Sequence, residues 1–202
     1  MKAASLSLAA LAVSLAVPSA AEDPPSAARP EYHEGDVFEF VGRFESITCS
    51  RWVVEARAAD GSQPWRCGEN VAHFLGDTGA LTRIVGRGGK ELVSFEPASP
   101  AMAFPMHVGA TWHGKFRLST SADLVSPDLD ESCEVTAFET VVVAAGSFPA
   151  FRYECKTAWS VWPLHGTATE TGWYAPAART VVRVVNDASP EWNLELARYS
   201  FK

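Results

Sequence analysis

The 202-residue chain has little basic charge: 17 lysines and arginines stand against 24 aspartates and glutamates, for a formal net charge of −7. Nucleic-acid binding requires a basic stripe that displaces counterions from phosphates, so this balance argues against a nucleic-acid partner. The chain also lacks the roughly 18 consecutive apolar residues of a membrane helix, and no membrane span is expected. Helical periodicity is missing too, which excludes a helical bundle.

Sequence motifs of catalysis are absent as well. There is no Gly-x-Ser-x-Gly elbow, no phosphate loop, no dinucleotide fingerprint and no His-Glu-x-x-His pair. We therefore assign no catalytic residue and predict no cofactor. The five histidines are scattered, and His113 is the one that could form an acid–base pair, with Glu134 or Asp123.

The first 21 residues have the pattern of a signal peptide. Lys2 supplies the positive start, residues 6–17 form a short apolar run, and Ser19-Ala20-Ala21 are small residues that suit signal peptidase. No cysteine near the cleavage region offers a lipid-attachment site. We predict cleavage after Ala21, with Ala16 and Ser19 as alternatives, and a soluble mature chain in the periplasm or outside the cell. Its formal charge would be −8, because Lys2 is the only charged residue removed from a chain of charge −7.

Cysteine is scarce, and the four cysteines fit disulfides better than a metal site. An even number in an exported chain is typical of disulfide bonds. Their spacing includes neither Cys-x-x-Cys nor a close Cys/His pair, so we predict no bound metal. Three pairings are possible, and we favour the one between near neighbours. The predicted disulfides are Cys49–Cys67 and Cys133–Cys155.

The register of one hairpin bears on the second disulfide. If the turn centres on Ala145, Val135 lies opposite Cys155, and Cys133 lies diagonal to it on the same face of the sheet. Twist or a bulge could then bring the two sulfur atoms together.

From residue 36 onward the pattern is that of β-strands. In residues 37–44, phenylalanines alternate with charged residues, as in a half-buried strand. Similar runs follow, separated by glycine-rich turns, and three prolines between residues 97 and 105 interrupt them. We predict an all-β fold, either an antiparallel β-sandwich or an open half-barrel of about ten to eleven strands.

The expected domain organisation is simple. The signal peptide of residues 1–21 precedes a flexible, proline-rich leader at residues 22–35. Residues 36–202 then form a single all-β domain, whose two sheet halves meet near residues 97–110.

Aromatic residues are numerous, with seven tryptophans and eleven phenylalanines. Most of them are expected to fill a core between packed sheets. A concave face lined by the surplus would instead bind an apolar ligand, a lipid chain or a partner segment. The candidate binding residues are Trp112, Trp159, Trp173 and Tyr174.

Three blocks in the second half carry a resemblance to a known family. They are FPMHVGATW at residues 104–112, VVVAAGSFPA at residues 141–150, and GWYAP at residues 172–176 followed by Val181-Val182-Arg183. Their order, over residues 100–200, resembles uncharacterised exported bacterial proteins of the DUF3108 group. The chain departs from that group's pattern at Ala144-Ala145, Gly172 and Ala178-Arg179. The group has no assigned activity, so the resemblance implies a β-rich, open-barrel-like exported domain and no catalytic residue.

Together these features favour a non-enzymatic periplasmic binding or envelope-associated protein. Its aromatic-lined concavity would take an apolar small molecule, a lipid or a segment of an envelope protein. One alternative is an exported hydrolase that uses His113 with a nearby carboxylate. Another is a structural interaction module that docks through a strand edge or through a loop at residues 119–130.

Overall fold

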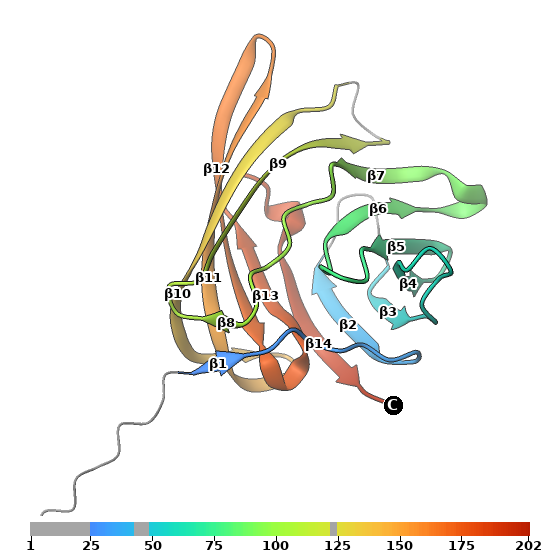
Figure 1. Cartoon of the computed structure of the whole chain (residues 1–202), viewed down its shortest axis with the longest axis vertical. Coiled ribbons are helices and arrows are strands. Elements are labelled where there is room, and N and C mark those ends of the chain that lie inside the picture. The colour runs from blue at the N-terminus through green and yellow to red at the C-terminus, as the bar shows by residue number, and fades with distance from the viewer. Residues whose placement is uncertain (1–24, 43–48, 122–124) are drawn as a thin grey trace, which may run out of the picture.

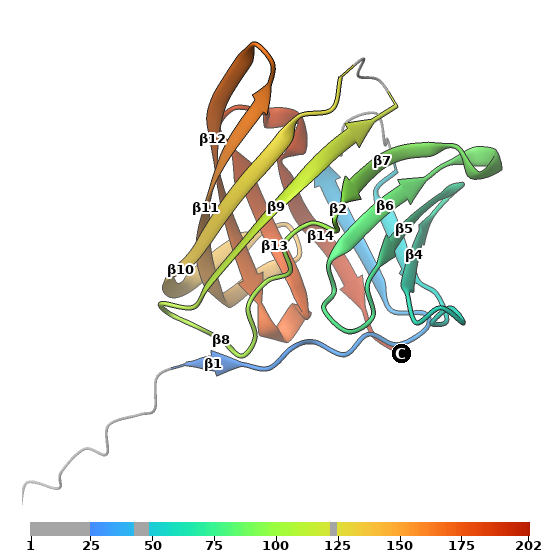
Figure 2. The same ribbon diagram turned by 45° about the horizontal axis from the view of Figure 1, so that its top comes forward.

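The computed structural model describes residues 25–42, 49–121 and 125–202, so the predicted signal peptide lies outside the described residues. In these ranges the chain is almost entirely β-structure. Twelve antiparallel strands form a closed barrel (Figures 1 and 2). In their order around the barrel they are β10 (Asp128–Val143), β11 (Gly146–Val161), β12 (Leu164–Ala175), β13 (Thr180–Asn186), β14 (Leu194–Ser200), β2 (Val37–Gly42), β3 (Arg51–Val54), β4 (Gln63–Cys67), β5 (Asn70–Phe74), β6 (Leu81–Val85), β7 (Glu91–Glu96) and β9 (Thr111–Thr120).

A small second sheet and three short helices complete the described part. Strand β1 (Ser26–Ala27) pairs with β8 (Met106–His107). The 3-10 helices are η1 (Arg87–Gly89), η2 (Pro176–Ala178) and η3 (Pro190–Trp192). None of the helices in the described ranges has the length and apolar character needed to cross a membrane.

The prediction of an all-β fold is confirmed, but the open barrel and the strand number need correction. The barrel closes because Val93–Glu96 of β7 pair with Arg117–Thr120 of β9. The barrel also contains a strand that the sequence pattern did not indicate, β4. Pro64 lies within β4 and cannot donate a backbone hydrogen bond, which argues against a strand in a sequence pattern. Its carbonyl nevertheless accepts from the amide of Glu55, at 2.9 Å.

The long strands β9–β12 lie on one side of the barrel and the short strands β3–β7 on the other (Figure 1). Residues 97–110 run between these two sides and then into β9. This connection contributes Met102, Phe104 and Met106 to a core that also contains Tyr153 and Tyr174. A second, larger core lies against the short strands. It includes Phe38, Val54, Trp65, Ala72, Ile84, Val93, Val182 and Leu196.

Residues 25–35, the described part of the leader predicted for residues 22–35, also pack on the barrel. Tyr32 contacts the rings of Phe38 and Trp65, at centroid distances of 6.0 and 4.9 Å. Its hydroxyl donates to the carbonyl of Arg179, at 2.8 Å. Burial raises the pKa of Tyr32 far above its ordinary value, with a further rise from Tyr174.

The structure contains disulfides between Cys49 and Cys67 and between Cys133 and Cys155. The predicted hairpin register was wrong, because Cys133 faces Cys155 directly. Two features explain the difference. Val143 pairs with Gly146, so the turn is shifted, and the register shifts again between Val135 and Ala137. Each shift moves the residue opposite Cys155 by one position. Together they move it by two, from the expected Val135 to Cys133.

Glycines on β12 leave space for aromatic rings on β11. Gly172 pairs with Tyr153, and Gly166 pairs with Trp159. A Cβ at position 166 would lie 2.6 Å from the Trp159 ring, and one at position 172 would overlap the Tyr153 ring. Each aromatic ring therefore covers a glycine on the neighbouring strand, an arrangement that fixes the register of the pair.

Gly172→Ala is expected to destabilise the protein by about 1–3 kcal/mol, because the added methyl group enters space that the fully packed Tyr153 ring occupies. Gly166→Ala should cost less, since the Trp159 ring is half-buried and has room to move. Urea unfolding of both variants provides the measurement. A loss at position 166 that equals or exceeds the loss at position 172 would contradict this account.

Candidate functional site

The inner face of β9–β12 brings polar and aromatic side chains together in three cross-strand rows. The strand register places them in successive layers. The rows are Phe116, Leu129, Trp159 and Gly166; then Gly114, Glu131, Thr157 and Ala168; then Trp112, Cys133, Cys155 and Glu170. This face points toward the connection at residues 97–110, because a Cβ at Gly114 would touch Pro100 and because Phe104 packs edge-on against Tyr174.

Burial changes along this inner face. Val135, Tyr153 and the two cysteines are buried in the core that the 97–110 connection covers. The layers nearer the β11–β12 turn are more open, since Glu131, Thr157 and Trp159 remain half-buried although they point inward. The inner face is thus tightly packed at the β1–β8 end and partly accessible to solvent toward the β11–β12 turn.

Two carboxyl groups lie in the half-buried layers. The hydroxyl of Thr157 donates to Oε2 of Glu131, at 3.1 Å. The hydroxyl of Tyr153 donates to Oε1 of Glu170, at 3.5 Å, and Asn186 also hydrogen-bonds to this carboxyl group. Within the described ranges, no ion pair joins a lysine, arginine or histidine to Glu131 or Glu170.

The surroundings of these groups favour their protonated forms. Burial raises the pKa of Glu170 to about 7, and the charge of Glu131 adds to the rise. Burial likewise raises the pKa of Glu131, although the hydrogen bond from Thr157 opposes the rise. Burial, followed by the nearby Glu170 and Glu131, holds the pKa of Tyr153 well above its ordinary value. At neutral pH the inner face therefore holds a carboxyl group that is close to half-protonated.

Glu131 also lies close to the sulfur atoms of Cys133 and Cys155, with the candidate ligand atoms within 4.8 Å of one another. Both sulfurs are joined in a disulfide and cannot act as thiolate ligands. This group therefore offers a metal ion one carboxylate and no thiolate.

The four predicted aromatic residues occupy three different environments. Trp112 and Trp159 lie half-buried on the inner face, and the Trp112 ring contacts Tyr153 at a centroid distance of 5.4 Å. Tyr174 is only 1% exposed and belongs to the packed core. Trp173 lies on the opposite face of β12, where its Nε1 donates to Oε1 of Glu139, at 2.8 Å. The structure thus brings two of the four candidates to the carboxyl pair.

Sequence reasoning missed Glu131, Thr157 and Glu170. The first two could have been found from strand alternation, since each is two residues from a cysteine of the predicted disulfide and so points to the same face. Glu170 depends on the register between β11 and β12, which the sequence pattern alone does not define.

His113, the candidate of the hydrolase alternative, lies on the outer face of β9. Its Nε2 is 2.6 Å from Oδ1 of Asp130, while Nζ of Lys115 is 2.8 Å from Oδ2 of the same carboxylate. Hydrogen bonds from Lys115 and His113 lower the pKa of Asp130. Neither expected partner has this role: Glu134 pairs with Thr111 in the sheet, and Asp123 lies outside the described residues. An exposed cluster of this kind is typical of a surface ion pair.

The fold defines the class of protein as an antiparallel β-barrel closed by long strands on one side and short strands on the other. Two solved structures share this architecture. One is described as an exported protein with a YmcC-like fold from Bacteroides fragilis, with a TM-score of 0.50, 14% identity, and coverage of 86% of this chain and 99% of that one. The other is described as a lipoprotein from Parabacteroides distasonis, with a TM-score of 0.52, 11% identity, and coverage of 87% and 100%.

At such identities the likeness concerns the fold alone. The chain matches no protein-family model and no curated protein.

Proposed function

We propose that the protein is a non-enzymatic exported binding protein that receives a small amphiphile at the half-buried inner face of its barrel. The observation that carries the proposal is the incomplete burial of Glu131, Thr157 and Trp159, which point inward above a tightly packed core. The chain acts in the periplasm or outside the cell. Its signal sequence directs it there, and the two solved neighbours are described as an exported protein and a lipoprotein.

The chemistry of the inner face defines the class of ligand. Leu129, Trp112 and Trp159 offer apolar and aromatic surface to a hydrocarbon body. Glu131 and Glu170 offer carboxyl oxygens to a donor group, and an aromatic ring close to a carboxylate suits an ammonium group in particular. The proposed ligand is therefore an apolar chain or ring that carries an amine or another hydrogen-bond donor.

We also propose that the chain belongs with the DUF3108 group, which it resembles over residues 100–200. The three blocks that carry the resemblance have structural positions that fit a shared scaffold. Residues 104–112 lead into β9, residues 141–150 form the β10–β11 turn, and residues 172–176 end β12.

Trp159→Ala is expected to weaken the binding of a simple amphiphile, dodecylamine, by about tenfold, because it removes an aromatic contact next to the carboxyl pair. Trp173→Ala is the matched control, since Trp173 lies on the opposite face of β12 and should bind as the native protein does. Isothermal titration at pH 8 measures both. Dodecanol and dodecanoate serve as comparison ligands, and dodecanoate should bind most weakly of the three because its charge repels the carboxylates.

Native mass spectrometry of protein purified from the periplasm gives a second readout, in which a bound small molecule is expected. The proposal fails if none of the three amphiphiles binds. It also fails if Trp159→Ala and Trp173→Ala lose affinity equally, because the inner face would then have no special role.

A further inference from the structure

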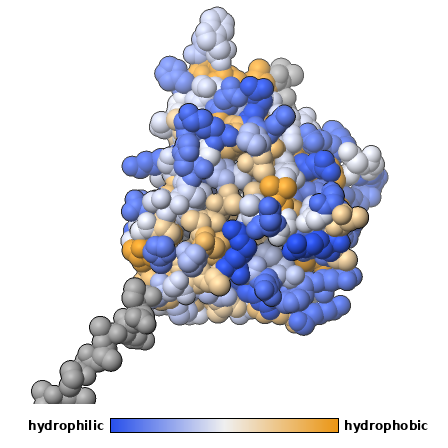
Figure 3. Space-filling view, in the orientation of Figure 1, coloured by the Kyte–Doolittle hydropathy of each residue, from blue (hydrophilic) through white to orange (hydrophobic). Residues whose placement is uncertain are grey.

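The turn between β11 and β12 is an exposed apolar tip that extends beyond the rest of the barrel (Figure 1). Trp162 at this turn is 95% exposed, and Leu164 is 63% exposed. In the space-filling view, hydrophilic residues cover much of this face, and some hydrophobic surface lies just below the pale tip (Figure 3). Trp162 and Leu164 lie together at one turn, and exposed apolar side chains that form a patch are typical of an interaction site.

Polar side chains lie directly below the tip, in one row across four strands. Asp128 pairs with both Arg117 and Ser160, and Ser160 pairs with His165. Nε and Nη2 of Arg117 lie 2.9 and 2.8 Å from Oδ1 of Asp128. These residues are exposed and alternate with inward-pointing Leu129 and Trp159, so they lie on the outer face. The row combines a carboxylate, a hydroxyl and an imidazole within the width of three strands.

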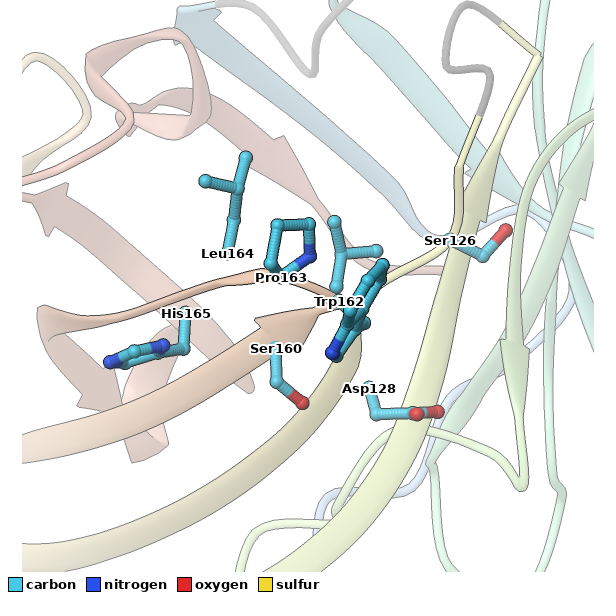
Figure 4. A pocket seen from close by; sticks show the side chains of 8 residues that line it. Ser126, Asp128, Ser160, Trp162, Pro163, Leu164 and His165 are labelled. Atoms are coloured by element: carbon cyan, nitrogen blue, oxygen red, sulfur yellow. The ribbon is translucent and has the colours of Figure 1, made fainter.

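The tip and three residues of the row, Asp128, Ser160 and His165, line a shallow, open pocket of about 460 Å³. Trp162, Pro163 and Leu164 form its apolar part, and the Trp162 ring stands beside Ser160 and Asp128 (Figure 4). The remaining lining residues are Ser126 and Val161. The pocket thus combines one flat aromatic face with several hydrogen-bonding groups, and it is open to large ligands because it lies at the end of the molecule.

We propose that this pocket is a saccharide-binding site, distinct from the inner face of the barrel. A pyranose ring has an apolar C–H face and a rim of hydroxyl groups. The Trp162 ring would pack against the C–H face, which removes apolar surface on both sides from water. Asp128 would accept hydrogen bonds from neighbouring hydroxyls, bonds that the charge of a carboxylate strengthens, while Ser160 and His165 can both donate and accept.

The polar row favours a saccharide over a lipid bilayer as the occupant. Insertion of the tip into a bilayer would bring Asp128, Arg117 and Ser160 toward the apolar phase, where the loss of their hydration is expensive. A sugar instead supplies hydroxyl partners to those same groups. The pocket also differs from the inner face of the barrel, whose polar groups are half-buried and do not reach this outer row.

Titration of the native protein with neutral oligosaccharides of glucose, galactose, mannose and N-acetylglucosamine tests the site, with binding followed by saturation-transfer NMR and calorimetry. Trp162→Ala is expected to weaken binding of the recognised sugar by about tenfold or more, while Trp162→Phe, which keeps a flat ring, retains most of it. Asp128→Asn should weaken binding less than Trp162→Ala. Trp173→Ala, a tryptophan on another part of the outer face, should bind as the native protein does.

Vesicles of phosphatidylethanolamine and phosphatidylglycerol test whether a lipid bilayer, rather than a saccharide, covers the tip. The saccharide site is overturned if no sugar of the panel binds at millimolar concentration, or if Trp162→Ala binds sugars as well as the native protein. Vesicle binding that depends on Trp162, without sugar binding, would also overturn it and would identify the tip as a membrane contact. Trp162→Ala should leave dodecylamine binding unchanged, because Trp162 is not on the inner face of the barrel, so failure at the barrel interior and failure at the tip can be told apart.

Discussion

Glu170→Gln is expected to stabilise the protein at pH 8 by about 2–3 kcal/mol and to leave its stability nearly unchanged at pH 4. In the folded protein burial, followed by the charge of Glu131, raises the pKa of Glu170 from 4.5 to about 7. Between these two values the folded state binds more protons than the unfolded state. The free energy of unfolding of the native protein must therefore fall as the pH rises through this window.

The neutral amide in the Glu170→Gln variant escapes this loss, because it never has to carry a charge beside Glu131. Its oxygen can still accept from Tyr153, as Oε1 of Glu170 does. Urea unfolding at pH 4, 6 and 8 would show the two proteins diverging as the pH increases. Glu134→Gln is the matched control, since Glu134 lies exposed on the outer face of β10 and its variant should follow the native protein at each pH.

A constant difference between Glu170→Gln and the native protein from pH 4 to pH 8 would contradict the account, since a change in packing alone does not depend on protonation. The expected divergence means that the charge of Glu170 makes the native protein less stable at neutral pH than the Glu170→Gln variant. Groups that lower stability in this way gather at sites selected for binding or chemistry, which is why the carboxyl pair supports the proposed function.

Strand alternation predicted most of the barrel but not its closure. Alternating phenylalanines over residues 37–44 indicated the strand β2, and Gly146 indicated the β10–β11 turn, because each signal lies within a few residues. The pairing of β7 with β9 joins residues 93–96 to residues 117–120, and no local pattern specifies such a contact. Pro64 concealed β4 for a related reason. A proline weakens a strand only where its missing N–H would have bonded to a neighbouring strand, and the sequence does not say which side of a strand is paired.

The candidate site was predictable only in part, for the same physical reason. Alternation within a strand is local, so it places Trp159 on the face of Cys155 and separates Trp173 from Tyr174. That Trp112 shares this face depends on how β9 and β11 pair with β10. The register of β12 against β11, which places Glu170 beside Cys155, depends on aromatic rings that cover glycines. A contact between an aromatic ring and a glycine can be predicted only when the pairing of the two strands is already known.

Asp36→Ala is expected to cost about 3–5 kcal/mol, the largest loss among these substitutions, because it leaves buried donors without an acceptor. Asp36 is 0% exposed. Its Oδ2 accepts from the amide of His33 at 3.0 Å and from Nη1 of Arg179 at 3.3 Å, and its Oδ1 accepts from the amide of Lys202 at 3.1 Å. One carboxylate thus joins the segment before β2, the end of η2 and the C-terminal residue.

Arg179 makes this loss larger than that of an isolated hydrogen bond. Its guanidinium lies 3.5 Å from the centroid of the Phe201 ring and donates to the carbonyl of Glu31, so it cannot easily turn toward water when Asp36 is removed. Glu69→Ala is the matched control, because it breaks an exposed ion pair with Arg87 and should change stability by less than about 1 kcal/mol.

Thermal and urea unfolding measure the loss in both variants, and limited proteolysis shows where it acts. In Asp36→Ala, cleavage should begin in residues 25–35, since Tyr32 and His33 lose the carboxylate that holds their segment on the barrel. Equal losses of stability in Asp36→Ala and Glu69→Ala would contradict this expectation, because the buried carboxylate would then contribute no more to stability than an exposed one. Residues 25–35 would then be held mainly by the other contacts, which include the pairing of β1 with β8 and the hydrogen bond of Tyr32.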